Sequence, residues 1–230
     1  MKHEDAGAAA TSRSTLPAAS LILMRDRLAG PPEIVMVRRS DTLVFAAGAY
    51  VFPGGRVDPV DVVAAAGRAA AVGDAEEWAA RIAAVRETHE ETGIADAADV
   101  AALVPFARWL PPVEAPRRFD TRFYLARARD DVADPVADGV ESSAAFWATA
   151  ADVLADCRAG RGHAIFPTRR LLERLARFAS FAEAREQAER LPAQTIAPWI
   201  EQRADGAWLC IPTDAGYPVS EELLGRTARF

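Results

Sequence analysis

The first sixty residues alternate between apolar runs and turn-forming residues in the manner of extended chain. Residues 18–26 (AASLILMRD) and 33–40 (EIVMVRRS) are rich in branched apolar side chains, and Gly-Pro-Pro between them predicts a hairpin connection. A third extended segment is predicted at 49–58 and contains Pro-Gly-Gly. Residues 59–74 are rich in alanine and weakly patterned, which favours a surface insertion with a short helix.

A helix is predicted to begin after Asp74. This residue is suited to the N-cap position, and Gly93 is suited to the C-cap position. Between them, four residues recur at the three- and four-residue steps of one helix face: Trp78, Ile82, Val85 and His89. We therefore expect this face to pack inward.

The rest of the chain continues as strands followed by helices. Strands are predicted at 100–110 and 120–128, helices at 149–160 and 168–190, and a hairpin at 203–212 with Asp-Gly at its turn. This order predicts an α+β domain whose mixed sheet lies in an α/β/α sandwich with extra C-terminal helices.

The predicted domain boundaries divide the chain into three parts. Residues 1–17 are expected to be a disordered lead-in, 18–190 the main domain with the insertion at 59–74, and 191–230 a C-terminal extension packed on it. The extension is expected either to cover a pocket or to form a homodimer contact.

Composition and charge exclude several classes of function. The net charge is −6, lysine occurs once, and no Lys/Arg run indicates binding to nucleic acid or a membrane surface. No apolar run approaches the roughly 20 residues needed to span a bilayer, and the N-terminus lacks a signal-peptide core. Cys157 and Cys210 are far apart and are predicted to be buried thiols in a reducing compartment. We expect a cytoplasmic protein.

Three glutamates are crowded near the end of the predicted helix. Glu87, Glu90 and Glu91 stand at i, i+3 and i+4, so a helix places them on one face. Like charges at this spacing cost a few tenths of a kcal/mol per pair. Mg²⁺ would reverse that sign, because it takes carboxylate and phosphate oxygens as ligands. The alternative is a solvated charged face in which Arg86 pairs with Glu90.

The surrounding residues resemble the Nudix box, G-x5-E-x7-R-E-U-x-E-E-x-G-U, in which U is bulky and aliphatic. Residues 86–94 (RETHEETGI) match its second half apart from Thr88, and FPGG at 52–55 matches the loop that opens it. The resemblance implies a Nudix fold and Mg²⁺-dependent (or Mn²⁺-dependent) hydrolysis of a diphosphate in a nucleotide. It also implies that Glu87, Glu90 and Glu91 bind the metal.

The other box residues have implied roles as well. Arg86 is expected to orient the carboxylates, while Gly54 and Gly55 let the backbone turn close to the metal. Thirty residues separate Gly55 from Arg86, where the standard box has thirteen, so the box is split by an insertion of seventeen. Counting back from Arg86 places the first box glutamate at Trp78. Glu76 and Glu77 stand two positions and one position before it, and whether either replaces the missing glutamate is left open.

A split box of this kind is similar to that of the coenzyme A and acyl-coenzyme A diphosphatases. Their upstream pattern is matched by Arg39, Ser40, Gly48 and Phe52, whereas Val44 stands in place of a second arginine. This resemblance implies cleavage of coenzyme A, or its thioesters, to 3′,5′-ADP and (acyl-)phosphopantetheine. ADP-ribose, NADH and damaged nucleoside triphosphates remain alternatives. A Nudix module that senses a nucleotide without cleaving it is a further alternative, although such modules usually lose box glutamates.

Three residues outside the box complete the predicted site. Glu141, in an expected loop before Trp147, is a candidate for an additional metal ligand or general base. Arg118 and Arg122 are candidates for phosphate contacts, because an acidic protein needs local positive charge to bind a polyanion. The expected partner is a small-molecule nucleotide.

Overall fold

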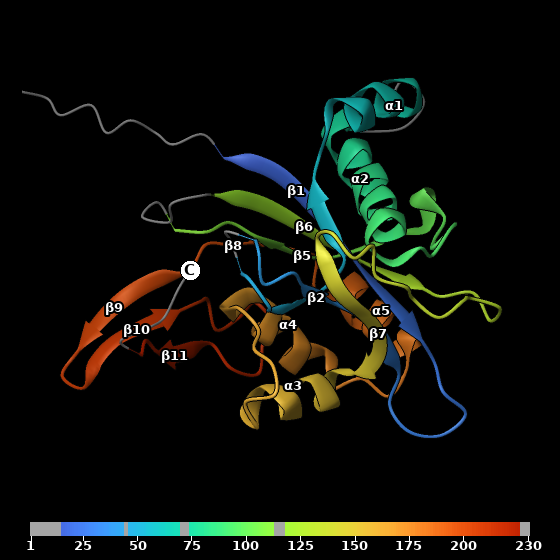
Figure 1. Ribbon diagram of the computed structural model, residues 1–230. Coiled ribbons are helices and arrows are strands. Elements are labelled where there is room, and N and C mark those ends of the chain that lie inside the picture. Colours follow the sequence, from blue (N-terminus) through green and yellow to red (C-terminus); the bar gives the residue numbers. More distant parts are fainter. Residues whose placement is uncertain (1–14, 44–45, 70–73, 113–117, 226–230) are drawn as a thin grey trace, which may run out of the picture.

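The computed structural model of the protein describes residues 15–43, 46–69, 74–112 and 118–225 (Figure 1). Its main sheet has eight strands, with β3-β2-β1-β6-β5-β8 in spatial order, β4 paired with β1, and β7 paired with β2. Most of the predicted N-terminal lead-in and the position of Val44 lie outside the described residues.

The N-terminal strands form as predicted, with one division. β1 (Leu16–Arg25) and β2 (Glu33–Arg39) pair antiparallel across the expected hairpin. The third extended segment gives two short strands, β3 (Tyr50–Val51) beside β2 and β4 (Gly54–Arg56) beside β1. Pro53 separates them, because proline has no N–H to donate to a sheet ladder.

The remaining strands make the sheet mixed. β5 (Val104–Trp109) follows a short 3₁₀ turn and pairs antiparallel with β6 (Phe119–Arg127), which runs parallel to β1. β7 (Ser142–Thr149), a strand that local patterning missed, pairs with β2. β8 (Thr195–Ile196) runs parallel to β5.

Helices cover both faces of this sheet, which confirms the predicted sandwich. Along β1, Leu21 and Leu23 pack with the helix α2 (Ala75–Thr92), and α1 (Pro59–Ala69) lies against α2. Ile22 and Met24 point the other way, into a core shared with α3 (Ala150–Arg158), α4 (Phe166–Leu175) and α5 (Phe181–Arg190). The alternation of a strand supplies both layers.

α2 has the predicted ends and a different buried face. Asp74 is its N-cap and accepts a hydrogen bond from the Glu76 N–H, and Gly93 is its C-cap. The predicted stripe of Trp78, Ile82, Val85 and His89 is half-buried to exposed, which corrects that expectation. The buried residues are small ones and a glutamate: Ala79, Ala80, Ala83, Ala84, Thr88, Glu91 and Thr92. Small side chains let α2 lie close to the sheet.

The C-terminal segment forms a separate three-stranded sheet. β9 (Trp199–Arg203) and β10 (Gly206–Cys210) make the predicted hairpin, and β11 (Glu221–Leu223) pairs with β10. Ile211 and Tyr217 reach the main core. Both cysteines are free thiols, and none of the described helices is long and apolar enough to cross a membrane.

Candidate active site

Arg86, in the C-terminal half of α2, forms hydrogen bonds with Asp61 of α1 and with Glu87 and Glu90 of α2. Its Nη1 donates to the Glu87 Oε1 at 3.0 Å and to the Glu90 Oε2 at 2.9 Å. Its Nε and Nη2 donate to the two oxygens of Asp61, at 3.0 and 2.9 Å. The Asp61 hydrogen bond is the main reason that the pKa of Arg86 is raised above its ordinary value.

Asp61 is fixed by the first turn of α1. Its side chain is 1% exposed, and its Oδ2 also accepts the Asp58 backbone N–H at 2.8 Å. A buried carboxylate that receives a bidentate guanidinium and a backbone N–H is a well-compensated charge. Asp61 thereby sets the position of Arg86 from outside α2.

Glu91 is more deeply buried than Glu87 and Glu90. The residue is 3% exposed, and its Oε2 accepts the Gly54 N–H at 2.9 Å. Burial raises the pKa of Glu91 to about 8, the Gly54 hydrogen bond and the charge of Arg39 oppose that rise, and the Glu87 and Glu141 charges add to it. The carboxylate is thus buried without a full counter-charge.

Glu87 shares this electrostatic environment. Its side chain is 14% exposed. Burial raises its pKa, Arg86 opposes the rise, and the charges of Glu90 and Glu141 add to it. Because Glu141 acts on both Glu87 and Glu91, the loop before β7 brings a fourth carboxylate to this cluster. The Glu141 carbonyl accepts the Ser40 N–H at 2.8 Å, which ties that loop to the end of β2.

The Pro-Gly-Gly loop fits closely between β1 and α2. Gly54 has a φ of 156°, and an added Cβ there would overlap the Ala19 carbonyl oxygen and the Ser20 side chain. A Cβ on Gly55 would overlap the Glu87 carboxylate. The two glycines therefore leave the space in which the backbone meets the glutamates.

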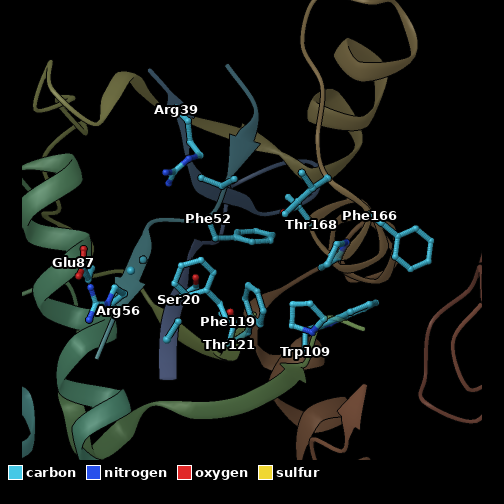
Figure 2. A pocket seen from close by; sticks show the side chains of 18 of the residues that line it. Ser20, Arg39, Phe52, Arg56, Glu87, Trp109, Phe119, Thr121, Phe166 and Thr168 are labelled. Atoms are coloured by element: carbon cyan, nitrogen blue, oxygen red, sulfur yellow. The ribbon is translucent and has the colours of Figure 1, made fainter. Parts of the chain in front are cut away.

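A cavity of about 570 Å³ opens beside this cluster. Its polar end is lined by Arg39, Arg56, Asp58, Arg86, Glu87, Glu90 and Glu141. Its other end carries aromatic rings, and Figure 2 shows Phe52, Phe119, Trp109 and Phe166 extending away from Glu87. A charged end beside an apolar end suits a ligand that has both a phosphate and an apolar part.

Eight of the predicted site residues line the cavity and five do not. Those on its wall are Arg39, Phe52, Gly54, Gly55, Arg86, Glu87, Glu90 and Glu141. Glu91 lies behind the wall. The Ser40 N–H donates to the Glu141 carbonyl, and the Ser40 hydroxyl pairs with that of Thr42. Gly48 has a φ of 68° and lies beside Asp41, away from the cavity.

The two predicted phosphate-binding arginines of the 118–122 segment are occupied elsewhere. Arg122 donates to the Glu76 carbonyl at 3.2 Å and forms ion pairs with Glu76 and Glu77. Arg118 donates to the Pro111 carbonyl at 3.2 Å. Both therefore hold neighbouring segments in place, and the arginines at the polar end of the cavity are Arg39, Arg56 and Arg86.

The carboxylates of this site are hard oxygen donors of the kind that a divalent metal takes as ligands. Within the described residues, no three His, Cys, Asp or Glu side chains already stand as a metal-binding group. Arg86 holds Glu87 and Glu90 by hydrogen bonds. The donor set nevertheless fits Mg²⁺ or Mn²⁺, since Glu91 is a buried carboxylate without a full counter-charge and the ligands are hard oxygens.

Comparisons with known proteins identify the family of the chain. A family model for the NUDIX domain matches residues 15–167. The chain belongs to the Nudix family. The predicted Nudix fold is thereby confirmed, and the protein is a Nudix hydrolase, an enzyme that acts on nucleoside diphosphate derivatives. Hydrolases of this family generally use divalent metals.

Solved structures give similar results. A NUDIX hydrolase from Alicyclobacillus acidocaldarius is 28% identical, with a TM-score of 0.66 over 75% of this chain and 96% of that chain. The NUDIX domain of Shewanella oneidensis NrtR, complexed with ADP ribose, is 18% identical, with a TM-score of 0.47 over 72% of this chain and 88% of that one. No curated protein matches the chain.

Asp61 is the residue that the sequence reading of this Nudix box missed. It follows Gly55 by six positions, where the pattern G-x5-E places the first glutamate. The insertion therefore lies between Asp61 and Arg86. Counting back from Arg86 passes through the inserted residues and so reaches the wrong position. Glu77 pairs with Arg81 at 2.9 Å and Glu76 with Arg122, so neither takes the expected place beside Arg86. Counting forward from Gly55 gives the correct residue.

Proposed function

We propose that this Nudix hydrolase cleaves the diphosphate of coenzyme A or its acyl thioesters in a Mg²⁺-dependent reaction. The products would be 3′,5′-ADP and (acyl-)phosphopantetheine. The observation that carries the proposal is the two-part cavity, in which arginines and carboxylates stand at one end and aromatic rings at the other. Coenzyme A has a strongly anionic nucleotide half and a far less polar pantetheine half.

The polar end supplies what diphosphate hydrolysis needs. A water oxygen forms a bond to one phosphorus, the bridging P–O bond breaks, and the second phosphate leaves with that bond's electron pair. Arg39 and Arg56 line this end and would neutralise phosphate charge. Arg39 also belongs to the upstream pattern that resembles the coenzyme A hydrolases, and its place on the cavity wall supports a phosphate-binding role.

The carboxylates divide into holding and proton-accepting roles. Glu87, Glu90 and Glu91 would hold Mg²⁺, which when bound supplies positive charge to the diphosphate and acidifies a bound water. Glu141 lines the cavity, and its charge acts on Glu87 and Glu91. It is our candidate for the base that accepts the proton of the attacking water. Arg86 would release Glu87 and Glu90 to the metal while Asp61 keeps it in place.

A substrate panel tests the proposal. Coenzyme A, acetyl-coenzyme A, ADP-ribose, NADH and 8-oxo-dGTP would be incubated with Mg²⁺ and then with Mn²⁺, and products separated by chromatography. We expect 3′,5′-ADP from coenzyme A, and a loss of at least about 100-fold in kcat/KM in Glu90→Gln and Glu91→Gln. Glu189→Gln, at an exposed glutamate of α5, is the matched control and should keep wild-type activity.

Two results would contradict parts of this proposal. Cleavage of ADP-ribose with coenzyme A left intact would overturn the substrate and keep the reaction. Tight binding of a diphosphate without cleavage of any would overturn the catalytic assignment and favour the sensing alternative.

A further inference from the structure

The C-terminal segment, residues 191–225 of the described chain, supplies part of the cavity wall. Pro198 and Leu209 line the cavity, and both lie beyond the residues 15–167 that match the family domain. β8 fixes this segment to the main sheet, where Ile196 pairs with Trp109 and its carbonyl accepts the Leu110 N–H at 2.9 Å. The wall is thus anchored next to an aromatic residue of the cavity.

The same segment holds that aromatic residue in place. The Trp109 Nε1–H donates to the Tyr217 hydroxyl at 2.9 Å, and the two rings meet edge to face with centroids 5.5 Å apart. Trp109 is 2% exposed and Tyr217 is 7% exposed. Without Tyr217 the indole N–H would lose its hydrogen-bond partner inside the core. Tyr217 therefore determines how Trp109 faces the cavity.

The apolar end of the cavity, here called the apolar compartment, consists of Phe52, Trp109, Phe119, Phe123, Phe166 and Leu209. The pairs Phe52–Phe123 and Trp109–Phe166 meet edge to face, with interplanar angles of 79° in both. Edge-to-face pairing of this kind packs the rings into one apolar wall.

Charge is confined to the opposite end. The charged lining residues that the structure describes come from β2, β4, α2 and the adjoining loops, and Figure 2 shows Arg39, Arg56 and Glu87 apart from Trp109 and Phe166. The uncharged polar side chains of the lining are the hydroxyls of Ser20, Thr121 and Thr168 and the indole of Trp109. A group that carries charge would lose its hydration in the apolar compartment without compensation, and a hydrocarbon would not.

We propose that the C-terminal segment is a specificity element of this enzyme, and that the apolar compartment it completes binds an uncharged hydrocarbon group on the leaving part of the substrate. Leu209 and Trp109 are the specificity-determining residues, and Tyr217 is a positioning residue. The inference rests on the proposed function for the bond that is cut. It adds a preference for acyl thioesters over free coenzyme A and assigns part of that preference to Leu209, which lies outside the family domain.

A chain-length series tests the compartment. The full-length enzyme would be assayed with Mg²⁺ on acetyl-, butanoyl-, hexanoyl- and octanoyl-coenzyme A. Burial of each methylene should raise kcat/KM by about fourfold until the compartment is full. Leu209→Trp fills the space, so we expect a loss of more than about tenfold with hexanoyl-coenzyme A and less than about threefold with acetyl-coenzyme A. Leu209→Ala should move the preferred length upward.

Further variants separate positioning from folding. Tyr217→Phe keeps the ring and removes the acceptor for Trp109, so KM for the long thioesters should rise while kcat stays constant. Leu223→Ala, at an exposed leucine of β11, is the matched control and should leave the length profile unchanged. If thermal unfolding shows that Leu209→Trp is unfolded, Leu209→Ala carries the test.

Binding without catalysis keeps this inference distinct from the proposed function. The Kd of each thioester would be measured calorimetrically in EDTA. Tightening with chain length that Leu209→Trp removes supports the compartment, even if no thioester is cleaved and the proposed function fails. Equal kcat/KM and equal Kd along the series, with cleavage intact, would overturn the compartment and leave the proposed function standing.

Discussion

Asparagine at position 61 would remove the charge that faces Arg86 while keeping the volume of the side chain. Two of the three hydrogen bonds to Asp61, from the Asp58 N–H at 2.8 Å and the Arg86 Nη2 at 2.9 Å, end on Oδ2. An amide nitrogen at that place accepts neither. Breaking a buried ion pair costs about 3–5 kcal/mol, and we expect about 3 because Arg86 is 22% exposed and keeps Glu87 and Glu90.

Urea unfolding followed by tryptophan fluorescence measures this change. Asp61→Asn should lower the midpoint with an unchanged slope, which reports a change in stability alone. It should also lower activity, because an unanchored Arg86 would compete for the carboxylates that we propose as metal ligands. The matched control is Glu77→Gln, whose carboxylate is 33% exposed against 1% for Asp61, so losing its pair with Arg81 should cost less than about 1 kcal/mol.

If Asp61→Asn lost less than about 1 kcal/mol, or if Glu77→Gln lost more than Asp61→Asn, Asp61 would not be the anchor of Arg86. The box would then be supported by an acid other than Asp61, such as Glu77.

Two further variants test the glutamate cluster. Gly55→Ala should displace the Glu87 carboxylate, lowering kcat/KM by roughly tenfold or more with a stability loss below about 2 kcal/mol; Gly67→Ala, whose added Cβ meets nothing within 4 Å, should keep full activity. Glu91 has a folded-state pKa of about 8 against an ordinary 4.5, so in EDTA the wild type should lose stability as pH rises between these values, by about 5 kcal/mol in total. Glu91→Gln should lack that loss and unfold at higher temperature than the wild type at pH 8, while being inactive; a parallel pH profile for both proteins would refute the buried, uncompensated carboxylate.

Local sequence signals were sufficient for much of the fold. Caps at Asp74 and Gly93 determine the ends of α2, because a side-chain acceptor and a left-handed glycine act within one turn. The central run of β6 is buried on both faces and reads as apolar in sequence. The strand β7 was missed because Glu141-Ser-Ser-Ala-Ala resembles a loop, and pairing with β2 makes it a strand.

The buried face of α2 required tertiary information. Hydrophobicity selects Trp78 and Ile82, whereas the sheet receives Ala80, Ala83 and Ala84, since the distance between helix and sheet decides which side chains fit. The same close approach buries Glu91, so three glutamates within five residues end in three different environments.

The candidate site divides in a similar way. The grouping of the α2 carboxylates and of the two glycines could be predicted from sequence, because their spacing within one helix and one loop is local. Apart from Phe52, the aromatic wall could not be predicted, since its members come from strands, a loop and a helix that only the folded chain brings together. Arg122 was misjudged because a strand pattern does not show that the N-terminus of α2 lies within its reach.

The parallel pairing of β1 with β6 has a consequence for how the protein is made. Leu16 pairs with Phe119 and Met24 with Arg127, across almost half of the 230-residue chain. A ribosome therefore releases the apolar β1 long before its central neighbour exists, and closing so distant a contact is slow. During synthesis that strand is exposed to other nascent chains, so we expect chaperone binding to begin at β1 and to end once β6 has emerged.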